Sequence, residues 1–399
     1  MLLQKYLHIK IGVEYRMKKY KVALIHNIIS PYRVPLFEGL SKHPSVELSV
    51  YFCAKTHKHR KWDILESDRY RYEVLSGKTL EFAGITYHIN PSIILRIIKE
   101  RCDVVIIAGC TDFTTQVAFI VSKLLRIPVI LWSEGIESAQ SLLGKVINPL
   151  IRCIVRNVDA VVVPGTMSRD FYIKLGAVPE KIFIAPNIVD NEMFIQRSSE
   201  IKKEKERFKR DLNIENMKII LFVGQLIERK GVKYLIKAYK RVKDEHGDCC
   251  LVIIGDGILK NQLEEICIKE HIKDVHFTGW LSEGRKIKYY SIADLFVLPT
   301  LKDVWGLVIN EAMCCGLPVI STKAAGCAVD MIIPGENGFI VNAANVEQLY
   351  LAMKNIIVDD ELTSEMGARS LEIIKSRFNL DKMVDGFVSA IEYVCLGKK

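Results

Sequence analysis

The chain has 399 residues, of which 49% are hydrophobic and 26% are charged, and its formal net charge at pH 7 is +9. This length suffices for two domains with separate cores, and the composition excludes a disordered or fibrous protein. The longest apolar stretches are interrupted by charged residues and proline before about 18 residues, so no transmembrane helix is predicted.

The positive charge is concentrated in one half of the chain. Residues 1–197 hold 27 Lys and Arg against 18 Asp and Glu, a balance of +9, whereas the remaining residues hold 29 of each. Such an excess can serve a membrane surface, nucleic acid or an acidic lipid, or it can be a solvated surface without a role. We expect a cytoplasmic protein that binds no nucleic acid. Peripheral contact with the inner face of a membrane is possible through the basic first half, where residues 142–157 combine cations with apolar side chains.

The eleven cysteines are scattered and form no C-x-x-C pair. Because no secretory signal precedes them, we expect buried free thiols in a reducing cytosol. The first 16 residues lack a clean apolar core and a cleavage site, and Met17 is followed at once by the first strong strand. Residues 1–16 are therefore predicted to be a dispensable extension.

Apolar runs typical of strands alternate with amphipathic runs typical of helices in the first half of the chain. Such alternation with short connections predicts a parallel sheet that is covered on both faces. Residues 53–80 are polar, aromatic and basic, and we expect a long surface excursion there. The strands are expected at 21–26, 46–51, 103–107, 129–131, 160–163 and 182–185, and the helices at 34–42, 92–101, 115–125 and 143–157.

The same alternation restarts in the second half, after a strongly charged helical segment at 197–213. We predict an α/β fold with two doubly wound, Rossmann-like domains that face each other across a cleft. The first domain is expected to span residues 1–192 and the second 193–377. The strands of the second domain are expected at 218–223, 251–254, 275–277, 295–298 and 319–321.

Three loops of the second half follow predicted strands and carry unusual residues. In the first, Gly224 ends a strand and Arg229 and Lys230 stand at the start of the next helix, which suits an anion unless the pair is merely solvated. The second is the turn Gly255-Asp256-Gly257. The third, residues 299–306, leads into a helix from about 306 to 315 that is apolar except for Asn310 and Glu311. A buried carboxylate at position 311 needs a partner in the protein or in a ligand.

These loops together resemble retaining glycosyltransferase family 4, a family of two-domain GT-B enzymes that use nucleotide sugars. The resemblance rests on Val223-Gly with Glu-Arg-Lys-Gly231, on Gly255-Asp-Gly, and on Asp303-x7-Glu311 followed by Ala-Met-x-x-Gly-x-Pro-Val-Ile. It covers nearly the whole chain from about Tyr20. It implies a hexosyltransferase that moves a sugar from UDP-sugar or GDP-sugar to a glycan or a lipid-linked acceptor with retention, in the biosynthesis of a surface polysaccharide such as lipopolysaccharide.

The resemblance also implies roles for individual residues. Lys230 would neutralise the donor diphosphate, Asp303 would contact the transferred sugar, and Glu311 would accept hydrogen bonds from the ribose. These three are the expected catalytic residues. The expected donor site consists of Gly224, Gln225, Arg229, Lys230, Gly255, Asp256, Gly257, Gly279, Trp280, Trp305, Gly306, Leu307 and Glu311.

The acceptor is expected to meet the first domain. Tyr32 and Arg33 follow the first strand and Glu134 follows another, although Pro31 also explains the first pair as turn chemistry. The last helix, within residues 378–399, would cross back to complete this domain, as in GT-B folds. We predict no cofactor and no metal, because no D-x-D pair stands at a strand end in a suitable context.

Two positions depart from the family pattern. Gln225 replaces the arginine that commonly follows the first glycine, and Asp303 replaces the first glutamate of the E-x7-E pair. A slow relative, a non-catalytic protein that binds nucleotide sugars, and a GT-B sugar-nucleotide epimerase therefore remain alternatives.

Overall fold

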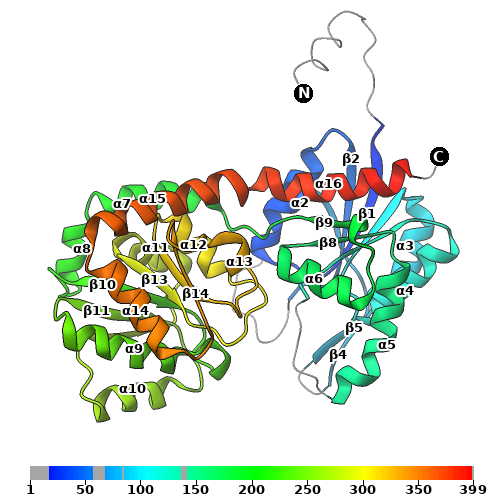
Figure 1. Ribbon diagram of the computed structural model, residues 1–399. Helices are drawn as coiled ribbons and strands as arrows, with labels where there is room; N and C mark the ends of the chain where they lie inside the picture. The colour runs from blue at the N-terminus through cyan, green and yellow to red at the C-terminus, as the bar shows by residue number, and fades with distance from the viewer. Residues whose placement is uncertain (1–17, 57–67, 83–84, 136–141, 398–399) are drawn as a thin grey trace, which may run out of the picture.

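The computed structural model describes residues 18–56, 68–82, 85–135 and 142–397. The segment 1–16 and most of the central part of 53–80 lie outside the described residues. The described residues form two α/β domains placed side by side, each built on a parallel sheet with helices on both faces (Figure 1). The two doubly wound domains expected from the alternation are confirmed.

The first domain contains a seven-stranded parallel sheet in the order β3-β2-β1-β6-β7-β8-β9. Val, Ile and Leu fill its central strands, as expected where both faces are buried. Its strands are β1 (Tyr20–Ile28), β2 (Val46–Ala54), β3 (Arg71–Val74), β6 (Val104–Ala108), β7 (Val129–Trp132), β8 (Ala160–Val163) and β9 (Ile182–Ile184). Its helices are η1 (Pro31–Arg33), α2 (Val34–Lys42), α3 (Ser92–Glu100), α4 (Phe113–Leu124), α5 (Leu142–Asn157), α6 (Thr166–Leu175) and η2 (Pro179–Lys181).

The second domain contains a six-stranded parallel sheet in the order β12-β11-β10-β13-β14-β15. Its strands are β10 (Lys218–Val223), β11 (Cys249–Ile254), β12 (Val275–Gly279), β13 (Leu295–Leu298), β14 (Val319–Thr322) and β15 (Gly338–Val341). Its helices are α7 (Asn191–Lys202), α8 (Lys205–Asp211), η3 (Glu228–Lys230), α9 (Val232–Glu245), α10 (Lys260–Lys269), α11 (Glu283–Ile292), α12 (Leu307–Cys314), α13 (Ala328–Met331), α14 (Val346–Ile357) and α15 (Asp360–Arg377).

The strand order reverses once in each sheet, between β1 and β6 in the first and between β10 and β13 in the second. At such a switch point the two connections leave in opposite directions, and a crevice opens at the carboxyl ends of the strands. The loops at these crevices are residues 29–30 and 109–112 in the first domain, and 224–227 and 299–306 in the second.

The prediction of a long surface excursion at 53–80 is wrong for the residues of this range that the structure describes. Residues 71–74 form edge strand β3, and β4 (Lys78–Phe82) pairs antiparallel with β5 (Ile85–Ile89). The aromatic residues explain the error, since Tyr70 is buried against Phe37, with ring centroids 5.4 Å apart. A segment that is polar on average thus places its rings on the core.

The last helix, α16 (Leu380–Leu396), runs from the second domain across the first, where it appears red in Figure 1. Met383, Phe387 and Ile391 are buried in the core of the first domain. The ring of Phe387 meets Trp132 edge to face, with centroids 5.1 Å apart. The end of the chain therefore supplies part of the core of the domain where the chain begins. None of the helices in the described residues is long and apolar enough to span a bilayer.

Replacing Phe387 with alanine is expected to lower the free energy of unfolding by about 3–5 kcal/mol, because it leaves a cavity between α16 and Trp132. Equilibrium urea unfolding measures the change. Leu396→Ala, at an exposed position of the same helix, is the control and should change stability by about 0.5 kcal/mol or less. Equal effects of the two substitutions would contradict the packing role of α16.

Candidate functional site

Three loops of the second domain are bonded to one another at the switch point. The N–H of Leu226 donates to the carbonyl of Asp256 (2.9 Å), and the N–H of Leu301 donates to the carbonyl of Arg229 (2.7 Å). Gly255 has φ +147°, and a Cβ there would lie 1.8 Å from the carbonyl oxygen of Gly224. Only glycine permits this approach, so the first two loops meet backbone to backbone.

The neighbouring positions in these loops line the same edge. Gln225 and Asp256 are exposed, and Gly257 lies against the carbonyl of Leu226. The carbonyl of Gly279 accepts from the N–H of Gly255 (2.9 Å), and the Trp280 side chain beyond it is 64% exposed. The residues expected at a nucleotide site are therefore adjacent to one another, with an exposed indole at the rim.

Glu311 has its partners within the protein. Its side chain is buried and accepts hydrogen bonds from Lys286 Nζ (3.1 Å to each oxygen) and from the Tyr290 hydroxyl (2.8 Å). Burial and the adjacent Glu311 raise the pKa of Tyr290 well above its usual value, so the phenol stays a donor. Sequence reasoning did not identify Lys286 and Tyr290 as the partners of Glu311. Their i, i+4 spacing, which places both on one face of α11, was the available signal.

Lys230, which is buried, forms an ion pair with the partly buried Asp303. Arg229 approaches the other oxygen of Asp303, with Nη1 to Oδ1 at 3.8 Å, and its side chain is largely exposed. The two cations of the first loop therefore flank the acid of the third loop. The attraction between Lys230 and Asp303, which are 73 residues apart in the sequence, holds the two loops together. Arg229, Lys230 and Asp303 together carry a net charge of +1.

The helix N-terminus lies beside this cluster. Gly306 has φ +104°, and α12 begins at Leu307. The first N–H groups of a helix have no partner within it, so they can bind an anion. The Trp305 side chain is buried and its Nε1 donates to Asn310 Oδ1 (3.0 Å), so only the backbone of Trp305 is available to a ligand.

Asn310 links this helix to the segment between the domains. Its Nδ2 donates to the carbonyl of Asn187 (2.9 Å), and the side-chain Oδ1 of Asn187 accepts from Arg33 Nη1 of the first domain (2.7 Å). All three side chains are buried. A second junction joins Thr166 to Asp330, which accepts from both the N–H and the hydroxyl of Thr166. The two domains thus meet through direct hydrogen bonds that the sequence did not reveal.

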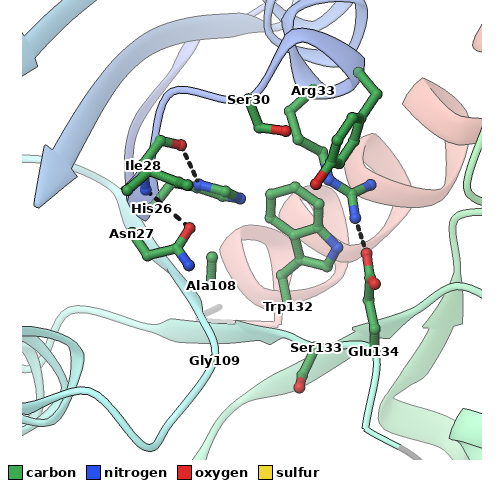
Figure 2. Close-up of a pocket in the computed structure, with 11 residues that line it drawn as sticks. His26, Asn27, Ile28, Ser30, Arg33, Ala108, Gly109, Trp132, Ser133 and Glu134 are labelled. Atoms are coloured by element: carbon green, nitrogen blue, oxygen red, sulfur yellow. Dashed lines mark hydrogen bonds and ion pairs between the residues drawn. The ribbon is translucent and has the colours of Figure 1, made fainter. Parts of the chain in front are cut away.

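The residues expected to meet an acceptor lie together around a cavity of about 240 Å³ in the first domain (Figure 2). Tyr32, Arg33 and Glu134 line it, and Arg33 forms an ion pair with Glu134. The guanidinium also lies over the Trp132 ring, 4.8 Å from its centroid. Burial lowers the pKa of Arg33 to about 10. Sequence reasoning did not single out His26 and Ser30, which also line this cavity.

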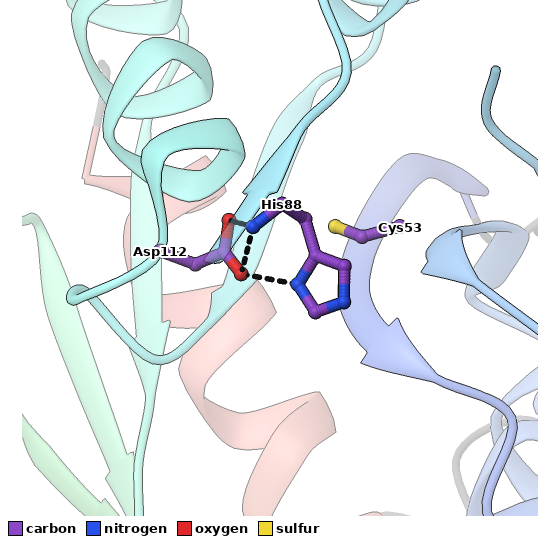
Figure 3. Close-up of side chains that lie close together, drawn as sticks. All are labelled: Cys53, His88 and Asp112. Atoms are coloured by element: carbon purple, nitrogen blue, oxygen red, sulfur yellow. Dashed lines mark hydrogen bonds and ion pairs between the residues drawn. The ribbon is translucent and has the colours of Figure 1, made fainter. Parts of the chain in front are cut away.

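Cys53, His88 and Asp112 form the one group in the described ranges whose ligand atoms lie close enough together for a metal ion (Figure 3). Asp112, however, caps α4 by accepting from the N–H of Thr114 (3.1 Å), and it also accepts from the His88 N–H and from His88 Nδ1 (2.5 Å). Burial raises the pKa of Cys53 to about 12, so the thiol stays protonated. The cluster is accounted for as a helix cap, and metal independence stays a prediction.

Comparisons with known proteins agree with this arrangement. The family model described as "Glycosyl transferases group 1" matches residues 203–372. This match covers most of the second domain, which is thus similar to glycosyl transferases group 1. The matched region contains Lys230, Asp303 and Glu311, whose functional roles stay predictions.

Two curated relatives and one solved structure illustrate the likeness. An uncharacterized glycosyltransferase, MJ1607 of Methanocaldococcus jannaschii, is 31% identical over 159 residues, which are 39% of this chain and 40% of that protein. Sulfoquinovosyl transferase SQD2 of Arabidopsis thaliana is 26% identical over 295 residues, covering 71% of this chain and 55% of that protein. The chain thus spans about half the length of the curated relatives that it matches.

The solved structure of Anabaena Alr3699/HepE in complex with UDP superposes with a TM-score of 0.73 at 16% identity, and covers 94% of this chain and 99% of that chain. Because the superposition extends over both domains, it confirms the expected GT-B fold.

Replacing Asn310 with alanine is expected to lower the free energy of unfolding by about 2–4 kcal/mol, because Trp305 Nε1 and the Asn187 carbonyl both lose a buried partner. Urea unfolding measures the change. The control Asn342→Ala, at an exposed position, should cost about 0.5 kcal/mol or less. An unchanged midpoint for Asn310→Ala would show that the link between the domains carries no stability.

Proposed function

We propose that this protein is a retaining hexosyltransferase that uses a nucleotide diphosphate sugar, of which UDP-sugars are the first to test. The observation that carries the proposal is the convergence of Lys230, Arg229, the α12 N-terminus and buried Glu311 at one switch point. Such a site offers positive charge for a diphosphate and a carboxylate for ribose hydroxyls. The solved structure of Anabaena Alr3699/HepE with UDP-glucose supports the choice of donor.

The chemistry follows from where charge develops. As the glycosidic bond breaks, negative charge accumulates on the nucleoside diphosphate, and fixed positive groups stabilise it. Lys230 and the first N–H groups of α12 are expected to supply that stabilisation. Asp303 is the ion-pair partner of Lys230. On donor binding we expect Lys230 to turn to the phosphate and Asp303 to accept from a sugar hydroxyl.

The acceptor is proposed to bind at the first-domain cavity beside Trp132. Retention of configuration, which follows from the family resemblance, is part of the proposal. Metal-independent transfer is also part of it, and follows from the lack of a D-x-D pair at a suitable strand end. The acceptor is proposed to be a glycan or a lipid-linked saccharide of a surface polysaccharide such as lipopolysaccharide. A lipopolysaccharide core glycosyltransferase, LpsE of Rhizobium meliloti, is 27% identical over 174 residues, which supports this choice.

Replacing Lys230 with alanine is expected to lower kcat/KM for the donor by about 10²–10³, the usual loss when one preorganised group is removed from a developing anion. The assay follows UDP or GDP release from a panel of nucleotide sugars, with and without acceptor and with and without EDTA. Proton NMR of the product reports the anomeric configuration.

Lys237→Ala, at an exposed position of α9, is the charge-matched control and should behave as wild type. Isomerised donor without transfer would favour an epimerase, and tight binding without turnover would favour a non-catalytic binding protein. Full activity of both Lys230→Ala and Glu311→Ala would contradict the site itself.

We further propose that the first domain rests on the anionic inner face of a membrane. The neighbouring helices α3 and α4 expose Leu95, Ile98, Ile120 and Leu124, the last of them 78% exposed. Exposed apolar side chains of this size, grouped on two helices, indicate an interaction surface. Cationic residues at the ends of the same helices, Lys99, Arg101 and Arg126, complement anionic lipid.

The double substitution Leu95→Gln and Leu124→Gln is expected to weaken binding to phosphatidylglycerol-containing vesicles at least about tenfold, because each buried leucine contributes about 1.5–3 kcal/mol. Vesicle co-sedimentation measures binding, with phosphatidylcholine vesicles to test the charge requirement. Ile268→Gln, at a position of the second domain that is 73% exposed, should bind as wild type. Equal binding by all variants would rule out this surface as the contact.

A further inference from the structure

His26 is the feature of the first-domain cavity that neither the motifs nor the proposed chemistry uses. It stands near the end of β1, and its Nδ1 lies 3.0 Å from the carbonyl oxygen of Ile28. A carbonyl can only accept a hydrogen bond, so Nδ1 carries the hydrogen. In the neutral ring Nε2 is then an acceptor, and it points away from Ile28 into the space beside Trp132 (Figure 2).

The surroundings keep this ring neutral. Its centroid lies 6.0 Å from that of Phe37, 6.1 Å from Phe52 and 5.3 Å from Trp132. Among the residues that the structure describes, the charged groups lining the cavity are Arg33 and Glu134, which pair with each other. Burial first, and then Arg33, lower the pKa of His26 to about 3. At neutral pH the ring therefore presents a lone pair and no charge.

A second polar group in the same wall is unpaired. Ser30 is buried, and its hydroxyl has no hydrogen-bond partner among the described residues. A buried hydroxyl without a partner loses hydrogen-bonding energy that a ligand can restore. His26 lies in β1 and Ser30 in the loop that follows it, and both line the cavity.

We propose that this cavity binds a neutral, hydroxyl-bearing unit of the acceptor, and that His26 Nε2 accepts a hydrogen bond from one of its hydroxyl groups. This inference rests on the proposed transferase function and names the chemical class of the acceptor. An anionic unit is disfavoured because the cationic group at the wall, Arg33, is already bound to Glu134 and Asn187. His26 orients the hydroxyl but does not remove its proton, because an imidazole with so low a pKa is too weak a base to act as a general base.

The test compares two small probes, methyl β-D-glucopyranoside and its uronate, methyl β-D-glucuronide. Saturation-transfer difference NMR on the full chain, free and saturated with UDP, gives their dissociation constants. Wild type is expected to bind the neutral glycoside at least tenfold more tightly than the uronate. His26→Phe, which keeps an aromatic ring among its aromatic neighbours, is expected to raise the dissociation constant of the neutral glycoside tenfold or more. Ser30→Ala is expected to raise it to a smaller extent.

His276→Gln, at an exposed histidine of the second domain, is the control and should bind the neutral glycoside as wild type does. Long-range proton–nitrogen NMR spectra of histidine-labelled protein should show His26 as the neutral Nδ1–H form at pH 6. A charged ring at that pH, preference for the uronate, or unchanged glycoside binding by His26→Phe would each overturn the inference.

The failure of this inference can be told apart from failure of the proposed function. Binding of UDP and of UDP-glucose is expected at the second domain and does not involve the first-domain cavity, so it tests the donor site alone. If the protein binds UDP-sugars but His26→Phe leaves the dissociation constant of the glycoside unchanged, only the proposed acceptor class is wrong. If the glycoside binds through His26 but no nucleotide sugar binds, the cavity stands and the transferase proposal fails.

Discussion

The hydrogen bond from Asn310 to the backbone carbonyl of Asn187 is the contact on which the arrangement of the two sites depends. It is buried, and each of its ends is committed to a second partner, Trp305 on one side and Arg33 on the other. Because a buried amide without partners is costly, all four groups must keep one geometry or lose several bonds together. The donor-side helix and the cavity of the first domain are thereby held in a common frame.

Electrostatic neutrality is the second constraint on the site. Each buried charge of the second domain faces an opposite one, Lys230 facing Asp303 and Lys286 facing Glu311. In the first domain Arg33 faces Glu134 in the same way. The attraction within each pair offsets the desolvation cost of burying its charges. A ligand that binds one of these charges must replace its ion pair. The affinity of the site is therefore the difference between the bonds made to the ligand and the ion pairs that are lost.

The switch points explain why the functional residues come from such distant parts of the chain. In each sheet the reversal of strand order opens the crevice between β1 and β6 or between β10 and β13. The glycine loop after β10 and the loop after β13 meet there, with Gly255 allowing the backbone of a third loop to approach within contact distance. In the first domain the same geometry brings His26 and Gly109 to one cavity.

The sequence by itself determined the two doubly wound domains, the position of β10, β13 and α12, and the need of Glu311 for a partner, because these follow from local periodicity and from the cost of burying a charge. Only the tertiary structure decided which partners serve: Lys286 and Tyr290 for Glu311, Asp303 for Lys230, and Asn187 for Asn310. It also turned the aromatic segment near Tyr70 into an edge strand. Such pairings join residues far apart in the chain, and no local pattern encodes them, since they arise when packing brings two loops to the same end of a sheet.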